Sequence, residues 1–129
     1  MSYKHILVAI DLSDESSKML VEKALEQAVP SQSKVSIVYV DVDHIVEERK
    51  DRQHYKEQLQ QLVDQCDYPI TDTSVVIGDL VVKVAGMVEK EHVDLVVCGH
   101  RDRSVTHLFS SAAKLVNNVS VDLLVVHLD

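Results

Sequence analysis

The sequence predicts one α/β domain, a three-layer sandwich in which a five-stranded parallel sheet lies between helices on both faces. Short valine-rich runs alternate with longer segments of helical spacing, as in repeated strand–helix units. Four of the five runs are almost continuously apolar, which is typical of parallel strands buried on both faces. The chain has 129 residues, the size of one common domain, so we expect a single domain over residues 1–129.

The five strands are expected where these apolar runs occur. Their ranges are 3–11, 34–41, 70–77, 93–99 and 121–128. The third run differs from the others because its first half, from Thr71 to Ser74, is polar. A strand with this composition fits the edge of a sheet better than its centre.

Four helices are expected between the strands. The first spans 13–29, with Ser13 and Asp14 as capping candidates and Pro30 as its stop. The second spans about 44–67, the third opens at Gly78 and Asp79, and the fourth follows residues 100–104. The residues expected to face inward are Ser17, Val21, Ala24 and Ala28 in the first helix, Ile45, Tyr55, Leu59, Leu62, Val63 and Cys66 in the second, Val81, Val84, Ala85 and Val88 in the third, and Leu108, Ala112, Leu115, Val116 and Val119 in the fourth.

A ligand crevice is expected at one place in such a sheet. If the sheet is wound in both directions from its first strand, a crevice opens between the carboxyl ends of the first and fourth strands. The first strand ends at Asp11, the fourth at Gly99 to Arg101, and the second strand brings Val40 alongside. We expect any small-molecule site to lie there.

The residues around this crevice allow more than one interpretation. The first turn, from Asp11 to Glu15, carries three carboxylates and no glycine, so it is unsuited to a phosphate. Its acids fit the start of a helix, although Asp11 at the end of a central strand can instead contact a ribose or a cation. The fourth loop has Arg101 and Arg103, which favour an anion or are simply solvated.

Charge and cysteine content exclude several classes of protein. The net charge of −8 argues against binding to nucleic acid or to anionic membranes. The first residues enter a strand pattern without the features of a signal peptide, and no apolar run is long enough to span a bilayer, so we expect a cytoplasmic protein. Cys66 and Cys98 match neither a redox pair nor a metal-binding pair, and we expect two buried, unreactive thiols.

No catalytic residue, metal ligand or cofactor is assigned. The seven histidines include no pair spaced three or four apart on a helix and no grouping with a cysteine. The sequence has no G-x-S-x-G nucleophile motif, and Cys98 lies within an apolar strand where its thiolate is disfavoured.

Taken together, several segments resemble the universal stress protein family, and most closely its UspA-type branch. They are Tyr3–Ser13, Lys34–Ile37, Asp41–Asp43, Asp67–Ile70, Gly78–Leu80, Asp94–His100, Ser110–Ala112 and Val121–Val126. The resemblance covers essentially the whole chain. It implies an adenine-nucleotide alpha-hydrolase-like fold with strand order 3-2-1-4-5. It also implies a cytoplasmic, non-enzymatic homodimer that acts through contacts with unidentified protein partners in stress or growth arrest.

The resemblance also implies weak or absent ATP binding. ATP-binding members of the family carry a G-x2-G-x9-G-[ST] motif after the fourth strand. Here Gly99 matches the first position, whereas Asp102, Ala112 and Ala113 occupy the others, and no further glycine follows. An adenine-nucleotide module with slow phosphotransfer stays open as an alternative, because positions equivalent to Asp11 and Val40 contact ribose and adenine in the family. The candidate crevice residues are Asp11, Val40, Gly99, His100, Arg101 and Arg103.

The final strand is expected to mediate dimerisation. In the order 3-2-1-4-5 it forms an edge, and a long apolar edge left open is an aggregation hazard. Antiparallel pairing with the same strand of a second copy removes that hazard and gives an isologous two-fold interface. The residues expected at this edge are Val121, Leu123, Val125 and His127.

Overall fold

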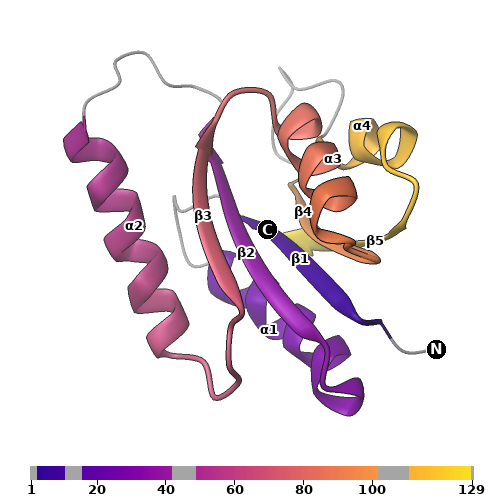
Figure 1. Ribbon diagram of the computed structural model, residues 1–129, viewed down its shortest axis with the longest axis horizontal. Helices are drawn as coiled ribbons and strands as arrows, with labels where there is room; N and C mark the ends of the chain where they lie inside the picture. Colours follow the sequence, from indigo (N-terminus) through magenta and orange to yellow (C-terminus); the bar gives the residue numbers. More distant parts are fainter. Residues whose placement is uncertain (1–2, 11–15, 42–48, 102–110, 129) are drawn as a thin grey trace.

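One parallel sheet organises the molecule (Figure 1). The computed structural model describes residues 3–10, 16–41, 49–101 and 111–128. The strands are β1 (His5–Ile10), β2 (Lys34–Asp41), β3 (Asp72–Ile77), β4 (Leu95–Arg101) and β5 (Asp122–Leu128). They pair in the order β3-β2-β1-β4-β5, and every neighbouring pair is parallel. The expected α/β class and strand order are confirmed, and so is the edge position of the third strand.

The helices lie on both faces of this sheet (Figure 1). They are α1 (Ser16–Ala28), α2 (Arg49–Asp64), α3 (Leu80–Glu91) and α4 (Ser111–Asn118), with a short 3-10 helix η1 (Val29–Ser31) after α1. Side chains of α1 and α2, such as Val21 and Leu59, pack on one face with Ile6 and Val8 of β1. Side chains of α3 and α4 pack on the opposite face, which completes the three layers.

Alternation along the central strands separates the two cores. In β1, Ile6, Val8 and Ile10 enter the core under α1 and α2, whereas Leu7 and Ala9 enter the core under α3 and α4. All five are nearly inaccessible to solvent. A strand whose side chains are buried on both faces has no polar side to display, which explains its continuous apolar sequence.

Several expected strand boundaries were wrong by one or two residues. The fourth strand begins at Leu95 instead of Val93, because the backbone N–H of Val93 donates to the carbonyl of Val88 and closes the end of α3. His92, in the left-handed conformation with φ of 56°, turns the chain there. The third and fifth strands begin at Asp72 and Asp122, and β1 begins at His5.

The ends of α1 and α3 follow the expected sequence signals. Pro30 lies in the 3-10 helix that ends α1, as expected of a residue that cannot continue a helix. Gly78, with φ of 134°, precedes Asp79, whose carboxylate caps α3 by accepting the backbone N–H of Val82 at 3.0 Å. Such a φ is unfavourable for residues with a side chain, so a glycine is required at this turn.

One inward-facing residue of α4 was expected incorrectly. Val116 is 60% exposed, whereas Leu115 is fully buried and Val119 packs against the same core. Residues four apart share one side of a helix, so the Leu115–Val119 pair places Val116 about 100° away from the core. The expected positions Ile45 and Leu108 lie outside the described residues.

Within the described part of the chain, no helix is both long enough and apolar enough to cross a bilayer.

Candidate functional site

The central strands β1 and β4 pair only over their first halves. Their register runs from Ile6 opposite Leu95 to Val8 opposite Val97, although β1 continues to Ile10 and β4 to Arg101. The neighbouring pairs β1–β2 and β4–β5 keep their register to their carboxyl ends. The sheet therefore separates between β1 and β4 at its carboxyl end, which is where winding reverses direction and where ligands bind in open α/β sheets.

Two of the expected crevice residues serve packing in this structure. Val40 is only 7% exposed and belongs to the core under α3 and α4. A Cβ atom added to Gly99 would lie 2.4 Å from Cδ1 of Leu128 and 3.4 Å from Cδ1 of Leu20. The absent side chain at Gly99 thus leaves room for Leu128 of the neighbouring strand, a role that needs no ligand.

His100 has a neighbour that its sequence position does not reveal. It lies opposite His127 in the register of β4 with β5, and the ring centroids are 6.3 Å apart. His100 is partly buried, and its Nδ1 atom is inaccessible and has no hydrogen-bond partner in the described structure. Linear spacing gives no signal for this pair, because only the register of two strands brings the rings together.

The remaining crevice candidates are not placed. Asp11 and Arg103 lie outside the described residues, as do Asp14 and Glu15 of the first turn, and only the backbone of Arg101 is described. The contribution of their charges to a ligand site stays a prediction.

The expected dimer edge is partly apolar and accessible. Leu123, Val125 and His127 alternate along β5 on the side of the sheet that carries α3 and α4. Val125 is 41% exposed, Leu123 is partly buried and His127 is exposed. Val121 lies one residue before β5 and packs partly against the core. Among the described strands β5 pairs with β4 alone, so its other side forms an edge of the sheet.

The opposite, amino end of the sheet contains a polar network that sequence reasoning missed. The ring of His5 is buried, with Nδ1 3.0 Å from the carbonyl of Glu91 and Nε2 2.7 Å from the hydroxyl of Ser36. A carbonyl only accepts, so Nδ1 donates to it, and in the neutral ring Nε2 then accepts from Ser36. Asp94 accepts the backbone N–H groups of Lys4 and His5. These contacts explain His5 as a structural residue.

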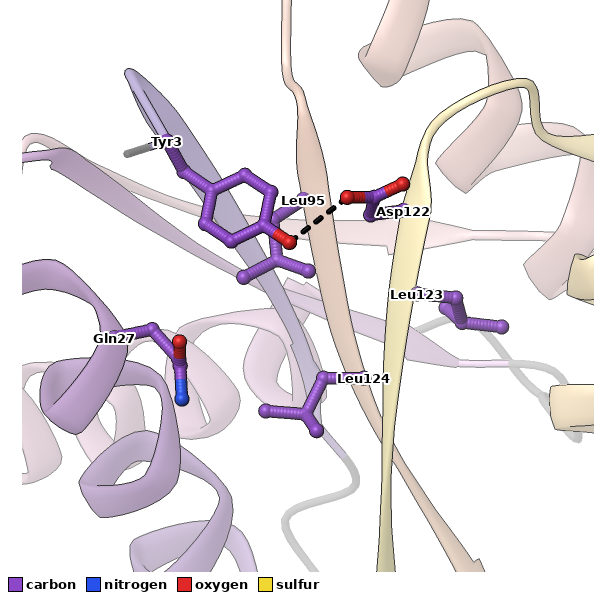
Figure 2. A pocket seen from close by; sticks show the side chains of 6 residues that line it. All are labelled: Tyr3, Gln27, Leu95, Asp122, Leu123 and Leu124. Carbon is purple, nitrogen blue, oxygen red and sulfur yellow. Dashed lines mark hydrogen bonds between the residues drawn. The ribbon is translucent and has the colours of Figure 1, made fainter. Parts of the chain in front are cut away.

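A cavity of about 340 Å³ lies at this amino end, between α1 and the starts of β4 and β5 (Figure 2). Figure 2 shows the Tyr3 hydroxyl pointing toward Asp122, to which it donates a hydrogen bond of 2.8 Å. This hydrogen bond, together with desolvation, raises the pKa of Tyr3 above its ordinary value. The pair ties the segment before β1 to the start of β5.

The two cysteines differ in accessibility. Cys98 is buried as expected, and desolvation raises the pKa of its thiol to about 11. Cys66 is only partly buried, which corrects the expectation of two buried thiols. It lines a groove of about 380 Å³ between α1 and α2, and its thiol donates to the Leu62 carbonyl at 3.3 Å. Burial, followed by Asp67 and Glu22, raises the pKa of Cys66 as well, so neither thiol is an activated nucleophile.

Sequence comparison relates the chain to a family of known proteins. A family model described as the universal stress protein family matches residues 2–127. Universal stress protein A of Escherichia coli K12 is 40% identical over 140 aligned positions, which cover 99% of this chain and 96% of that protein. The protein of the same name from Yersinia pestis is 38% identical, with coverage of 99% and 94%. The alignments are longer than this chain, so these relatives contain residues that it lacks.

Solved structures share the fold at lower identity. A universal stress protein in complex with cAMP superposes with a TM-score of 0.76 at 22% identity and covers 98% of both chains. A universal stress protein from Archaeoglobus fulgidus in complex with dAMP gives a TM-score of 0.72 at 16% identity, covering 97% of this chain and 98% of that one. UspA from Lactobacillus plantarum gives 0.73 at 18% identity, with coverage of 98% and 99%.

Proposed function

The chain belongs to the universal stress protein family, and from this membership we propose that it acts in the cytoplasm as a non-enzymatic homodimer of the UspA type. In this proposal the dimer contributes to the response to stress or growth arrest through contacts with other proteins. The observation that carries the proposal is the open edge of β5 with its accessible apolar row.

The edge strand supports self-association on energetic grounds. Val125 is 41% exposed at the centre of β5, and Leu123 is only partly buried beside it. Pairing β5 with the same strand of a second copy satisfies the unpaired backbone groups of the edge and buries these side chains. An antiparallel arrangement gives each copy the same contacts, as an isologous dimer requires.

A non-enzymatic role is supported by the chemistry of the nucleophile candidates. The Cys98 thiol has a pKa of about 11 and is buried, so it is protonated at neutral pH. His5, which is buried, uses both ring nitrogens in structural hydrogen bonds. The sequence after Gly99 contains no further glycine with which to surround a triphosphate.

The dimer proposal is tested by measuring mass in solution. Light scattering at micromolar concentration should give twice the chain mass of 14.5 kDa. Val125→Glu places a charge in the proposed interface and should shift the mass to that of one chain. Val82→Glu is the matched control, since Val82 is 66% exposed on α3 and should leave the dimer intact. A monomeric wild-type protein, or a dimeric Val125→Glu variant, would overturn the proposal.

A second candidate function is the binding of an adenine nucleotide. It is favoured by the separation of β1 from β4 at the carboxyl end, together with the structural neighbours that are described as complexes with cAMP and dAMP. In this alternative Asp11 contacts the ribose and Val40 lies near the base.

Titration calorimetry with AMP, cAMP and Mg-ATP distinguishes the two functions. Binding tighter than about 100 μM that Asp11→Ala weakens would favour the nucleotide module. Asp72→Ala is the control, because Asp72 is exposed at the amino end of β3, and the crevice lies at the carboxyl end of the sheet. Absence of binding to the wild-type protein at that level would favour the role through protein contacts.

A further inference from the structure

The pairing of β4 with β5 brings two imidazole rings to the same place. His100 and His127 are register partners on adjacent parallel strands. They share one face of the sheet, since Val97 in β4 and Val126 and Leu128 in β5 point into the core on the other face. The ring centroids are 6.3 Å apart and the ring planes are inclined by 51°.

This spacing is close to that of two imidazoles bound to one metal ion. A nitrogen ligand lies about 2.0–2.1 Å from Zn²⁺, so two rings that share one ion have centroids roughly 5–6 Å apart. The observed 6.3 Å is slightly longer. His127 is exposed, so rotation about its side-chain torsions can close this difference without a change in the strand register.

No protein group in the described structure bonds to Nδ1 of His100. The Nδ1 atom of His100 is inaccessible and makes no hydrogen bond there, although a buried polar atom without a partner is unfavourable. His5 differs from His100, because Glu91 and Ser36 occupy both of its ring nitrogens. Nδ1 of His100 therefore has no protein partner to give up, and a turn of this partly buried ring about its side-chain torsions can bring Nδ1 toward His127.

The chemistry of the pair selects a class of ion. Imidazole nitrogen suits Zn²⁺, Cu²⁺ and Ni²⁺, whereas Mg²⁺ and Ca²⁺ prefer oxygen ligands. Cys98 does not join the pair, because the described residues contain no group of three histidine, cysteine or acidic side chains fit to hold a metal. The chain's net charge of −8 raises the local concentration of cations.

We propose that His100 and His127 form a binding site for one divalent transition-metal ion per chain, of the Zn²⁺ or Cu²⁺ type, with water in the remaining coordination positions. The bound ion joins β4 to β5 at the carboxyl end of the sheet. Both ligands come from one chain, although His127 also lies on the proposed dimer edge and His100 in the proposed nucleotide crevice.

The test is calorimetric titration of the full chain with ZnCl₂ in a buffer that does not chelate metals. Wild-type protein should bind one ion per chain. Loss even of a residue that only supports a metal ligand costs about 10- to 100-fold in affinity, so His127→Gln and His100→Gln should each weaken binding at least tenfold. His54→Gln is the matched control, since His54 is an exposed histidine on α2 and should leave the affinity unchanged.

A spectroscopic readout keeps the test independent of folding defects. In the proton NMR spectrum of the wild-type protein, Zn²⁺ should shift the ring signals of His100 and His127 and leave those of His54 and His5 in place. Exposed His127 tolerates replacement, so its variant remains informative if His100→Gln fails to fold. The proposal is overturned if wild-type protein binds no Zn²⁺, if His127→Gln binds it as wild type does, or if the two ring signals do not move. None of these results bears on the mass of the protein in solution.

Discussion

Gly99 lies in a crowded part of the structure, whereas Gly86 has open space around its Cα atom. Gly99 lies in β4 against Leu128, where an added Cβ atom would approach Cδ1 to 2.4 Å. Gly86 lies within α3, and a Cβ atom added there would have no neighbour within 4 Å outside its own helix backbone. The same substitution should therefore act with opposite sign at the two positions.

Gly99→Ala should lower the free energy of unfolding by about 1–3 kcal/mol, because Leu128 must shift in a filled core. Gly86→Ala should raise it by about 0.5–1 kcal/mol, since alanine is the better helix former. Urea unfolding followed by circular dichroism measures both. Equal effects of the two substitutions would contradict the packing role of Gly99.

The buried Cys98 thiol should make the free energy of unfolding depend on pH in the alkaline range. Burial raises the pKa of its thiol from an ordinary value near 9 to about 11, so the folded state holds the proton more tightly than the unfolded state. The stabilisation is complete below the unfolded pKa and is lost as pH rises from about 9 through 11. At about 1.4 kcal/mol per pKa unit, a rise from about 9 to about 11 corresponds to a loss on the order of 3 kcal/mol.

The measurement is the free energy of unfolding at several pH values in this range, for wild type and Cys98→Ala. Other groups also titrate there, so the difference between the two proteins is the quantity to follow. This difference in the free energy of unfolding should change by about 3 kcal/mol as the pH rises from about 9 to about 11, and it should be constant below about pH 8. A constant difference throughout would mean that burial does not shift this thiol.

The start of α3 is capped by a side chain. Asp79 accepts the N–H of Val82 at 3.0 Å and so satisfies one of the backbone donors that a helix leaves free. The helix contains several valines, which have low helix propensity, and it is held on the sheet by Val84 and Val88. Its cap therefore compensates for a weak local preference.

Asp79→Ala should lower the free energy of unfolding by about 1 kcal/mol, whereas Asp79→Asn should change it by only a few tenths, because asparagine retains a capping oxygen. Chemical denaturation of the two variants measures the difference. A similar loss in both would indicate that the charge of Asp79, and not its hydrogen bond, stabilises the helix.

Elements with strong local signals were predictable from the sequence. The central strands are apolar on both faces, and the cap at Asp79 and the stop at Pro30 have defined chemistry. The boundaries of the elements were harder to predict. The backbone N–H of Val93 bonds to the last turn of α3, and the apolar periodicity of the sequence does not reveal this hydrogen bond. Val116 was misplaced because a short helix with several apolar residues permits two inward faces.

The whole molecule carries a net charge of −8, which should prevent association with nucleic acid. Fluorescence anisotropy of a labelled DNA duplex at about 50 mM salt, where phosphate contacts are strongest, should show no binding at micromolar protein. A saturable increase in anisotropy that falls with added salt would contradict this prediction.

The candidate sites were less predictable than the fold because they depend on relations between distant segments. The topology places the split between β1 and β4, and the resemblance to a family supplied that order. The neighbours of His100 and Gly99 follow from the register of β4 with β5, and no linear spacing contains that register. Tyr3 and Asp122 lie at opposite ends of the sequence, and only the folded sheet brings them into contact.

The two borders of the sheet are chemically unequal, and this limits how copies can add to one another. β3 begins with exposed Asp72 and Thr73, whereas the outer strand at the other border carries Leu123 and Val125. If both edge strands were apolar, each copy could pair with two others, and an open-ended assembly of sheets would be favoured. In the proposed dimer only the β5 edge pairs, so an assembly built through the sheet would end once two copies have covered that edge.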